Sequence, residues 1–287
     1  MNIIFDGLSL GSIYALIALG YTMVYGIAKM LNFAHGDIIM VGAYAAFSTL
    51  ALMGHPILAI VLAIIICTTL GIVIERLAYR PLRSASPLAV LITAIGVSYM
   101  LQSLAQLIFG SQSRPVTIFE SKPVEIFGAN VSSSSIITLC VAALIMVALA
   151  LFVAKTKTGR AMLAVSEDRG AAGLMGINVN RIIMITFAIG SALAAFASIF
   201  YLLYIPKVTP TLGAMPGIKA FTAAVIGGIG SIPGAMIGGI LLGLIEKICL
   251  SIPALASYTT SIEFATLILI LLVKPTGLLG KRRREKV

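Results

Sequence analysis

Charged residues are scarce in this sequence, and tryptophan is missing altogether. Only 10% of the 287 residues are charged, whereas a soluble domain contains about 25%. The chain is 60% hydrophobic, with a mean hydropathy of +1.10, and it holds several apolar runs of about 20 residues, the length of a membrane-spanning helix. It also lacks the alternating segments of a transmembrane β-barrel. The sequence therefore predicts an all-α, polytopic integral membrane protein.

Groups for hydrolytic, redox or metal chemistry are also few. Cys67, Cys140 and Cys249 stand singly in apolar surroundings, which favours neither a disulfide framework nor a thiolate metal site. His35 and His55 lack the neighbours that a nucleophilic triad or a zinc site requires. No G-x-x-x-x-G-K-[ST] motif is present, so the chain has no P-loop with which to hydrolyse ATP. We expect no catalytic residue, metal or cofactor bound by this chain, and a membrane enzyme is disfavoured.

The apolar segments predict eight or nine spans. They lie at residues 8–27, 30–53, 56–75, 88–109, 136–154, 182–204, a pair within 218–250, and 262–273. The first run follows MNIIFDG, which has no Lys or Arg and so argues against a secretory signal. The count depends on 218–250, where Gly and Pro predict a broken or re-entrant helix pair.

Basic residues are concentrated in three connections, at 76–83, 155–181 and 274–287. The positive-inside rule places all three in the cytoplasm, with the N-terminus outside and the C-terminus inside. The segments 110–135 and 205–217 then lie outside. The net charge of +10 therefore reflects membrane topology, not nucleic-acid binding. We expect one transmembrane domain over 1–287, with a cytoplasmic loop at 155–181 and a basic cytoplasmic tail at 274–287.

The segment VIGGIGSIPGAMIGG (225–239) is unusually rich in glycine. Ser231 is a suitable helix N-cap, and Pro233 is tolerated in the first helical turn. Broken helices often line transport pathways, and small residues also allow helices to pack closely. The sequence favours packing slightly, and the two interpretations are compatible.

Several polar residues are candidates for a path through the membrane. Asn32 and Asp37 precede the second apolar run, where ionisable groups suggest function; alternatively, Asn32 caps a helix whose positive end Asp37 stabilises. Ser98, Gln102 and Gln106 form one stripe, and Tyr14, Tyr21 and Tyr25 form another. Hydrogen bonding between helices explains both stripes equally well. Glu246, Lys247 and Glu263 are expected near helix ends, and His35 is expected to be structural.

The segment GRAMLAVSEDRGAAGLMGINVNR (159–181) interrupts the apolar pattern with five charged residues. Ser166 is a candidate N-cap, Glu167 and Asp168 suit the positive helix end, and Gly176 is a candidate terminator. A short helix over 167–175 is therefore predicted, about 13 Å long. Its small apolar surface, which includes Ala171 and Ala172, suits docking into a groove, although a solvated loop or a helix lying against its own chain is equally consistent.

This loop resembles the coupling loop of bacterial ATP-binding-cassette (ABC) importer permeases, whose x-A-A-x-x-x-G pattern matches residues 170–176. Gly170 stands where that motif commonly has Glu, and the usual Leu-Pro ending is absent. The wider loop, the opening GLSLGSIYALIALGYTMVYGIAKMLNFAHGDIIMVGAYAAF and GGIGSIPGAMIGGILLG are similar to branched-chain amino-acid permeases, of the smaller, LivH type. The resemblance runs from about residue 5 to 280.

The resemblance implies an importer of five parts in the bacterial inner membrane. Two permeases, which are this chain and either a LivM-type partner or a second copy, form the path. Two cytoplasmic ATPases use ATP and Mg, and an extracytoplasmic binding protein captures leucine, isoleucine or valine. The ATPase-coupling residues it implies are Glu167, Asp168, Ala171, Ala172 and Gly176. Candidate path residues are Asn32, Asp37, Gln102, Gln106 and Ser231. Alternatives are the same architecture carrying urea, short amides, other amino acids or sugars, and an ion-coupled secondary amino-acid transporter.

Overall fold

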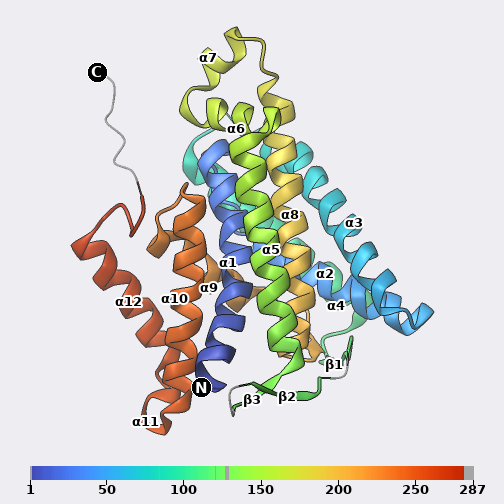
Figure 1. Ribbon diagram of the computed structural model, residues 1–287. Helices are drawn as coiled ribbons and strands as arrows, with labels where there is room; N and C mark the ends of the chain where they lie inside the picture. Colours follow the sequence, from blue (N-terminus) through green and yellow to red (C-terminus); the bar gives the residue numbers. More distant parts are fainter. Residues whose placement is uncertain (1, 84, 120, 127–128, 281–287) are drawn as a thin grey trace.

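The computed structural model describes residues 2–83, 85–119, 121–126 and 129–280, and within these ranges the chain is almost entirely helical (Figure 1). Seven of the described helices are long and apolar enough to cross a membrane. They are α1 (Asn2–Ala28), α2 (His35–Met53), α3 (Pro56–Ile74) continued by the π-helical turn η1 (Glu75–Tyr79), α4 (Pro87–Phe109), α5 (Ser133–Lys155), α8 (Val179–Tyr204) and α10 (Ile232–Ser251). Two shorter apolar helices are α9 (Ala214–Gly227) and α12 (Thr259–Val273). The predicted all-α, polytopic architecture is confirmed.

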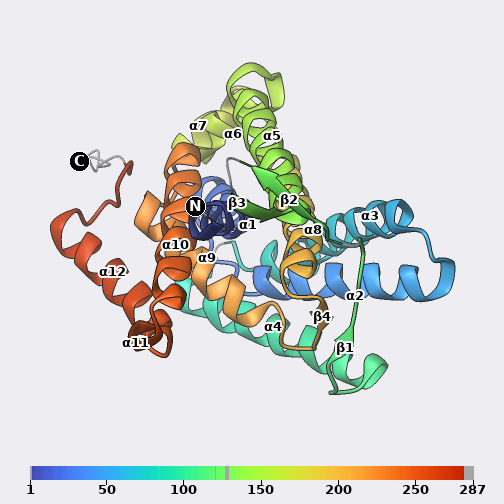
Figure 2. The ribbon, with the colours of Figure 1, turned by 60° about the horizontal axis from the view of Figure 1, so that its bottom comes forward.

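Helix α1 runs through the centre of the bundle, where α5, α8, α9 and α10 surround it (Figure 2). Its closest approach is to α10, and small residues make that approach possible. A Cβ atom on Gly11 would lie only 2.7 Å from the Cα of Ile240, so a larger residue would force the helices apart. In lipid, helices associate through van der Waals contact and not through exclusion of water, so this close packing stabilises the core.

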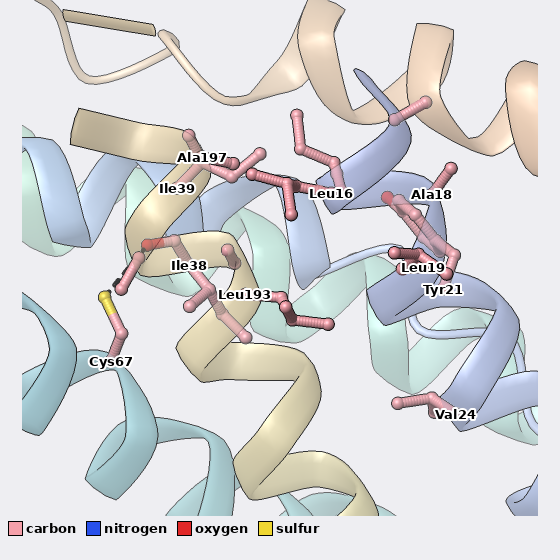
Figure 3. Close-up of a cluster of buried hydrophobic side chains, with 14 of the residues drawn as sticks. Leu16, Ala18, Leu19, Tyr21, Val24, Ile38, Ile39, Cys67, Leu193 and Ala197 are labelled. Carbon is pink, nitrogen blue, oxygen red and sulfur yellow. Dashed lines mark hydrogen bonds between the residues drawn. The ribbon is translucent and has the colours of Figure 1, made fainter. Parts of the chain in front are cut away.

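A second part of the core joins α1, α2, α3 and α8 (Figure 3). Leu16, Ile38 and Leu193 are buried there together. The Cys67 thiol of α3 donates a hydrogen bond to the Ile38 carbonyl at 3.4 Å. This contact ties α3 to α2 across 29 residues of sequence.

The predicted broken helix pair is present as α9 and α10. With 14 residues, α9 is shorter than the roughly 20 residues that cross a membrane. As predicted, Ser231 caps α10, since its side chain accepts a hydrogen bond from the Gly234 N–H at 3.2 Å. The glycines of α10 pack against α1 and α9, so close helix packing, one of the two interpretations, is confirmed.

Helices α2 and α9 begin side by side inside the bundle. The prediction of a span from residue 30 is wrong: Lys29 has a positive φ of 51° and residues 29–34 are not helical, so α2 begins at His35. A Cβ atom on Gly36, in the first turn of α2, would lie 3.3 Å from the Cα of Gly217, in the first turn of α9. His35 packs against Gly20, eight residues or about 12 Å before the end of α1. The suggestion that Asn32 caps α2 is also wrong, because Ala34 holds that position.

The two ends of the bundle differ in composition. At one end, β1 (Arg114–Pro115) pairs with β4 (Lys207–Val208), next to a hairpin of β2 (Pro123–Ile126) and β3 (Ala129–Ser132), and the short α11 (Pro253–Ala256) lies at this end too. At the other end lie α6 (Lys157–Glu167) and α7 (Arg169–Leu174) (Figure 1). Contacts between 83 and 180, 169 and 28, and 278 and 226 bring the basic connections 76–83 and 155–181 to this second end, together with residues 274–280. The tail beyond residue 280 lies outside the described residues.

Candidate functional site

The predicted helix over 167–175 is divided in the structure. Glu167 ends α6, and the second helix, α7, begins at Arg169. The expected cap is wrong: Ser166 lies within α6 and donates a hydrogen bond to the Leu163 carbonyl. Asp168 is the cap, because its carboxylate accepts hydrogen bonds from the N–H groups of Gly170 and Ala171 at 2.8 and 3.0 Å. A carboxylate satisfies two free donors and also favours the positive helix end.

The far end of α7 presents apolar side chains away from the protein. Leu174 is 91% exposed and Met175 is 83% exposed, and α7 lies farthest from the bundle (Figure 1). Gly176 ends the segment as predicted, with a φ of 79°. Of the other predicted coupling residues, Glu167, Asp168 and Ala171 are exposed, but Ala172 is buried at 4% exposure. Ala172 therefore faces its own chain.

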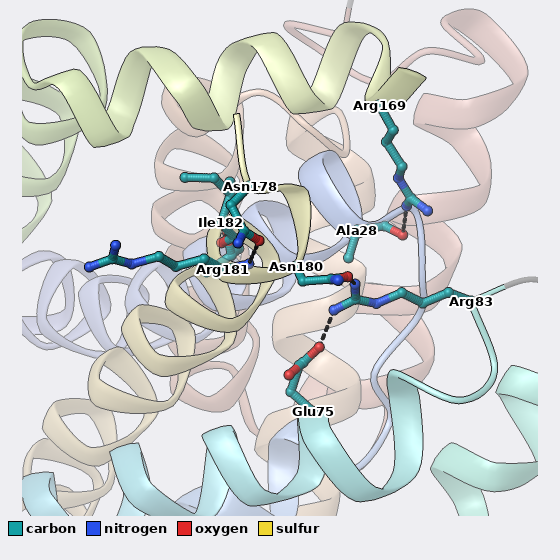
Figure 4. A network of polar contacts seen from close by, with 9 residues as sticks. Ala28, Glu75, Arg83, Arg169, Asn178, Asn180, Arg181 and Ile182 are labelled. Carbon is teal, nitrogen blue, oxygen red and sulfur yellow. Dashed lines mark hydrogen bonds and ion pairs between the residues drawn. The ribbon is translucent and has the colours of Figure 1, made fainter. Parts of the chain in front are cut away.

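Two arginines fasten this segment to the helices below it (Figure 4). Arg169 donates a hydrogen bond to the carbonyl of Ala28, the last residue of α1. Arg83 donates to Asn180 and forms an ion pair with the buried Glu75. Burial and the nearby charge of Arg83 lower the pKa of the Arg169 guanidinium, which nevertheless remains a cation at neutral pH. Cations near the C-terminus of a helix are favourable, because that end carries partial negative charge.

A narrow crevice lies between the last turns of α1, the segment that follows them, and α9. Tyr21 and Tyr25 of the predicted tyrosine stripe line it, together with Asn32 and Phe221. Met30, Leu31, Ala224 and Ile229 complete the lining, so the turn between α9 and α10 contributes to it as well. No water-sized sphere fits within it. The crevice is therefore closed in this conformation, with apolar walls and a few polar groups.

Asn32 is the most unusual of these polar groups. It is 2% exposed, and its Oδ1 accepts a hydrogen bond from the Tyr79 hydroxyl at 2.8 Å. Its Nδ2 has no partner among the described residues, and neither has Nε2 of the buried His35. Leaving a buried donor unpaired costs about 1–3 kcal/mol. An unpaired amide beside a crevice is thus available to a ligand that supplies an acceptor.

The structure brings together only part of the other polar stripe. The Gln102 amide donates to Asp37 at 2.9 Å and to Ser98 at 3.3 Å. Asp37 is buried in the first turn of α2, and the Gln102 amide is one of the side-chain donors that it accepts from. Gln106 is exposed on the surface of the subunit and takes no part in the pair. Ser231 lies at the start of α10 and serves as its cap.

A buried ionic cluster joins four helices and was not predicted. Lys219 of α9 forms ion pairs with Glu246 of α10 at 2.8 Å and with Glu263 of α12 at 3.1 Å. The hydroxyl of Tyr14, in α1, donates to Glu246 at 2.7 Å. Glu246 and Glu263 lie near helix ends as expected, but both carboxylates are buried, and Glu263 is only 1% exposed. The sequence signal was Lys219 itself, a single cation within an apolar stretch.

Comparison with known proteins agrees with this architecture. The model of the family described as "Branched-chain amino acid transport system / permease component" matches residues 3–271. The high-affinity branched-chain amino acid transport system permease protein LivH of Escherichia coli K12 is 45% identical, over 99% of this chain and 96% of its own length. The corresponding permease BraD of Pseudomonas aeruginosa is 45% identical, over 98% and 96%.

A solved structure supports the fold alone. A chain of PsaBC from Streptococcus pneumoniae, determined in complex with a Fab fragment, superposes with a TM-score of 0.51 at 16% identity. The match covers 96% of this chain and 93% of that one. The described helices, the family model and the two relatives over nearly the whole length agree. This chain is a membrane permease that belongs to the family of permease components of branched-chain amino acid transport systems.

Proposed function

We propose that this chain is one of the two membrane subunits of an ATP-driven ABC importer for leucine, isoleucine and valine. The observation that carries the proposal is the 45% identity to branched-chain amino acid permeases over nearly the entire chain. The alternative cargoes, which are urea, short amides, other amino acids and sugars, lack a comparable relative among those described above. An apolar crevice with few polar groups also suits a substrate with a branched apolar side chain.

The proposal includes partners that supply energy and partners that capture the substrate. Two cytoplasmic ATPases bind and hydrolyse ATP with Mg, a LivM-type permease or a second copy completes the path, and an extracytoplasmic binding protein delivers the amino acid. The complex resides in the bacterial inner membrane, and the end of the bundle that carries α6 and α7 faces the cytoplasm. Support for this orientation comes from the basic connections 76–83 and 155–181, which lie at that end.

The docking surface for the ATPases lies at the tip of the coupling loop, residues 155–181. Leu174 and Met175 provide exposed apolar area, and Asp168 caps the helix that carries them. We assign direct contact to these side chains, to the exposed Ala171 and to Gly176, and we assign a supporting role to the buried Ala172. A large hydrophobic side chain that is fully buried on docking contributes about 1.5–3 kcal/mol.

The substrate path includes the crevice and the region where α2 and α9 begin. Helix N-termini carry partial positive charge and favour the carboxylate of a bound amino acid. Asn32 offers an unpaired amide donor to the same carboxylate, and Asp37, held by Gln102, offers a negative charge to the ammonium group. Ser231 maintains the α9–α10 turn that closes one side of the crevice.

Uptake by the reconstituted importer tests both the mechanism and the cargo. Proteoliposomes that contain this chain, its partner permease, both ATPases and internal ATP receive the binding protein and radiolabelled leucine from outside. We expect vanadate to abolish uptake, an ionophore to leave it unchanged, and unlabelled isoleucine or valine to compete. Uptake that follows an ion gradient would favour the secondary transporter, and competition by urea or ribose alone would reassign the cargo.

A further inference from the structure

The contact between Arg169 and the end of α1 has a role beyond capping a helix. We propose that Arg169 is a positioning residue that couples the docking helix α7 to the wall of the substrate crevice. This inference rests on the proposed function, because it requires that α7 is moved by the ATPases. It assigns the transmitting role to one side chain and names the element that receives the motion.

The first step of the argument is the location of Arg169 within the coupling loop. It is the first residue of α7, directly after the capping Asp168 and five residues before the exposed Leu174. Helix α7 has only six residues, so a displacement of its tip moves its first residue as well. Ala172 is buried against the rest of the chain, so α7 packs on the loop that carries it. Any force applied at the tip therefore reaches the Arg169 side chain.

The second step is what Arg169 holds. Its guanidinium donates to the carbonyl of Ala28, one of the carbonyls at the end of α1 that have no partner within the helix. Lys29 donates to the carbonyl of Gly26 in the same turn. Two cations thus stabilise the negative end of the central helix. Of these two, Arg169 belongs to the coupling loop, whereas Lys29 directly follows α1 in the chain, so a movement of the loop reaches the end of α1 through Arg169.

The third step is the short distance from Ala28 to the crevice. The chain leaves α1 at Lys29 and immediately forms the crevice wall with Met30, Leu31 and Asn32. Asn32 is held on its other side by Tyr79, at the end of η1. A shift of the end of α1 therefore changes the position of the wall relative to Tyr79 and Phe221, and it opens or closes the space between them.

Arg83 holds the opposite wall of the crevice (Figure 4). It joins Glu75, at the start of η1, to Asn180, at the start of α8. These contacts join η1, and with it Tyr79, to the start of α8, whereas Arg169 contacts the end of α1. The two arginines lie side by side but hold different walls of the crevice, so a movement of α7 changes the separation of the walls.

The test compares Arg169→Ala with Arg181→Ala in the complete reconstituted importer. Arg181 lies in the same loop, but its side chain is exposed and points away from Ala28 and Arg83 (Figure 4). We expect Arg169→Ala to lower leucine uptake about tenfold while ATP hydrolysis changes by less than about twofold, because coupling between sites is typically worth 5–150-fold. Arg181→Ala should leave both rates unchanged. Arg169→Lys, which retains one donor and the charge, should give intermediate uptake.

A second measurement follows the crevice directly. A single cysteine at Leu31, in a background with Cys67, Cys140 and Cys249 replaced by alanine, is reacted with N-ethylmaleimide. With Arg169 intact, the reaction rate should differ between the nucleotide-free and the vanadate-trapped importer, and in Arg169→Ala this difference should disappear. An unaltered difference, normal uptake, or loss of the ATPases from the purified complex would overturn the inference. So would failure of both the Ala and the Lys variants to accumulate in the membrane, since the contact would then serve folding.

These outcomes separate the inference from the proposed function. If Arg169→Ala transports normally while vanadate still abolishes wild-type uptake, the transmitting role fails and the importer assignment stands. If wild-type uptake needs no ATPase, the proposed function fails, and the role of Arg169 fails with it.

Discussion

Lys219 is the residue whose loss should cost the most stability. Its ammonium group is the partner of two buried carboxylates that belong to different helices. Replacement by methionine, Lys219→Met, keeps much of the side-chain volume but leaves both carboxylates without a cation. Removing one partner of a buried ion pair costs about 3–5 kcal/mol. We expect a clearly lower midpoint of thermal unfolding for the purified chain in detergent.

Two variants make this prediction specific. Lys207→Met, at an exposed position of β4, should have little effect. Adding Glu263→Gln to Lys219→Met should recover part of the loss, because one buried negative charge is removed. If the single and double variants were equally stable, the cluster would contribute nothing through charge.

The two glutamines of the predicted stripe should now behave differently. Gln102 donates to the buried Asp37, whereas Gln106 is exposed. Because leaving a buried charged group with one donor fewer costs about 1–3 kcal/mol, Gln102→Leu should reduce leucine uptake about tenfold with normal assembly. Gln106→Leu is the matched control and should retain uptake. If both variants changed uptake equally, the contact of Gln102 with Asp37 would have no role in transport, and both glutamines would serve helix packing.

The contacts that sequence reasoning missed share a physical cause. Lys219 and Glu263 are 44 positions apart and Tyr14 and Glu246 are 232 apart, so only the packing of α1, α9, α10 and α12 brings them together. The pair of Gln102 and Asp37 depends in the same way on how α4 meets α2. Each residue could be identified as a polar exception in an apolar span, but its partner could not.

At the scale of single elements, the apolar tip of α7 makes the sharpest prediction. The double variant Leu174→Ser/Met175→Ser should leave the fold unchanged, because both side chains are already exposed. It should weaken binding of the ATPases, since the apolar area would no longer be buried on docking. Co-purification from detergent measures this binding. Leu163→Ser, at an exposed site of α6, is the control, and an unweakened complex would show that docking occurs elsewhere.

Gly176 allows charge and conformation to be separated. Its φ of 79° strains most side chains, but Asn and Asp tolerate this left-handed region better than other residues, and a Cβ atom would meet no neighbour within 4 Å. Gly176→Asp should uncouple ATP hydrolysis from uptake, because its charge would be desolvated on docking. Gly176→Asn has the same shape without the charge and should be milder. Equal losses of uptake in the two variants would point to backbone strain instead.

Local signals predicted the elements better than their boundaries. Apolar length located the spans, and Ser231 and Gly176 marked a helix start and a helix end that the structure confirms. The start of α2 was placed too early because residues 30–34 are as apolar as a helix but follow Lys29, whose φ is positive. The start of the docking helix was predicted two residues too early. Ser166 and Asp168 are both suitable caps, but Asp168 holds the position because its carboxylate accepts hydrogen bonds from two N–H groups.

At the scale of the whole molecule, the asymmetry of the two ends predicts the orientation in the membrane. The basic connections 76–83 and 155–181 share one end with residues 274–280, and the paired strands β1 and β4 mark the other. A cysteine at Lys157 should react with an impermeant maleimide only after the membrane is opened. A cysteine at Lys122 should react in intact spheroplasts. The reverse pattern would invert the topology.

The central claim is that this chain provides a path and takes its energy from outside itself. The most direct measurement is accumulation of leucine against its gradient in proteoliposomes that contain this chain and its partner permease, with an imposed proton or sodium gradient. We predict no accumulation until both ATPases and internal ATP are present, and rapid accumulation afterwards. Accumulation without any ATPase, driven by either ion gradient, would contradict the account.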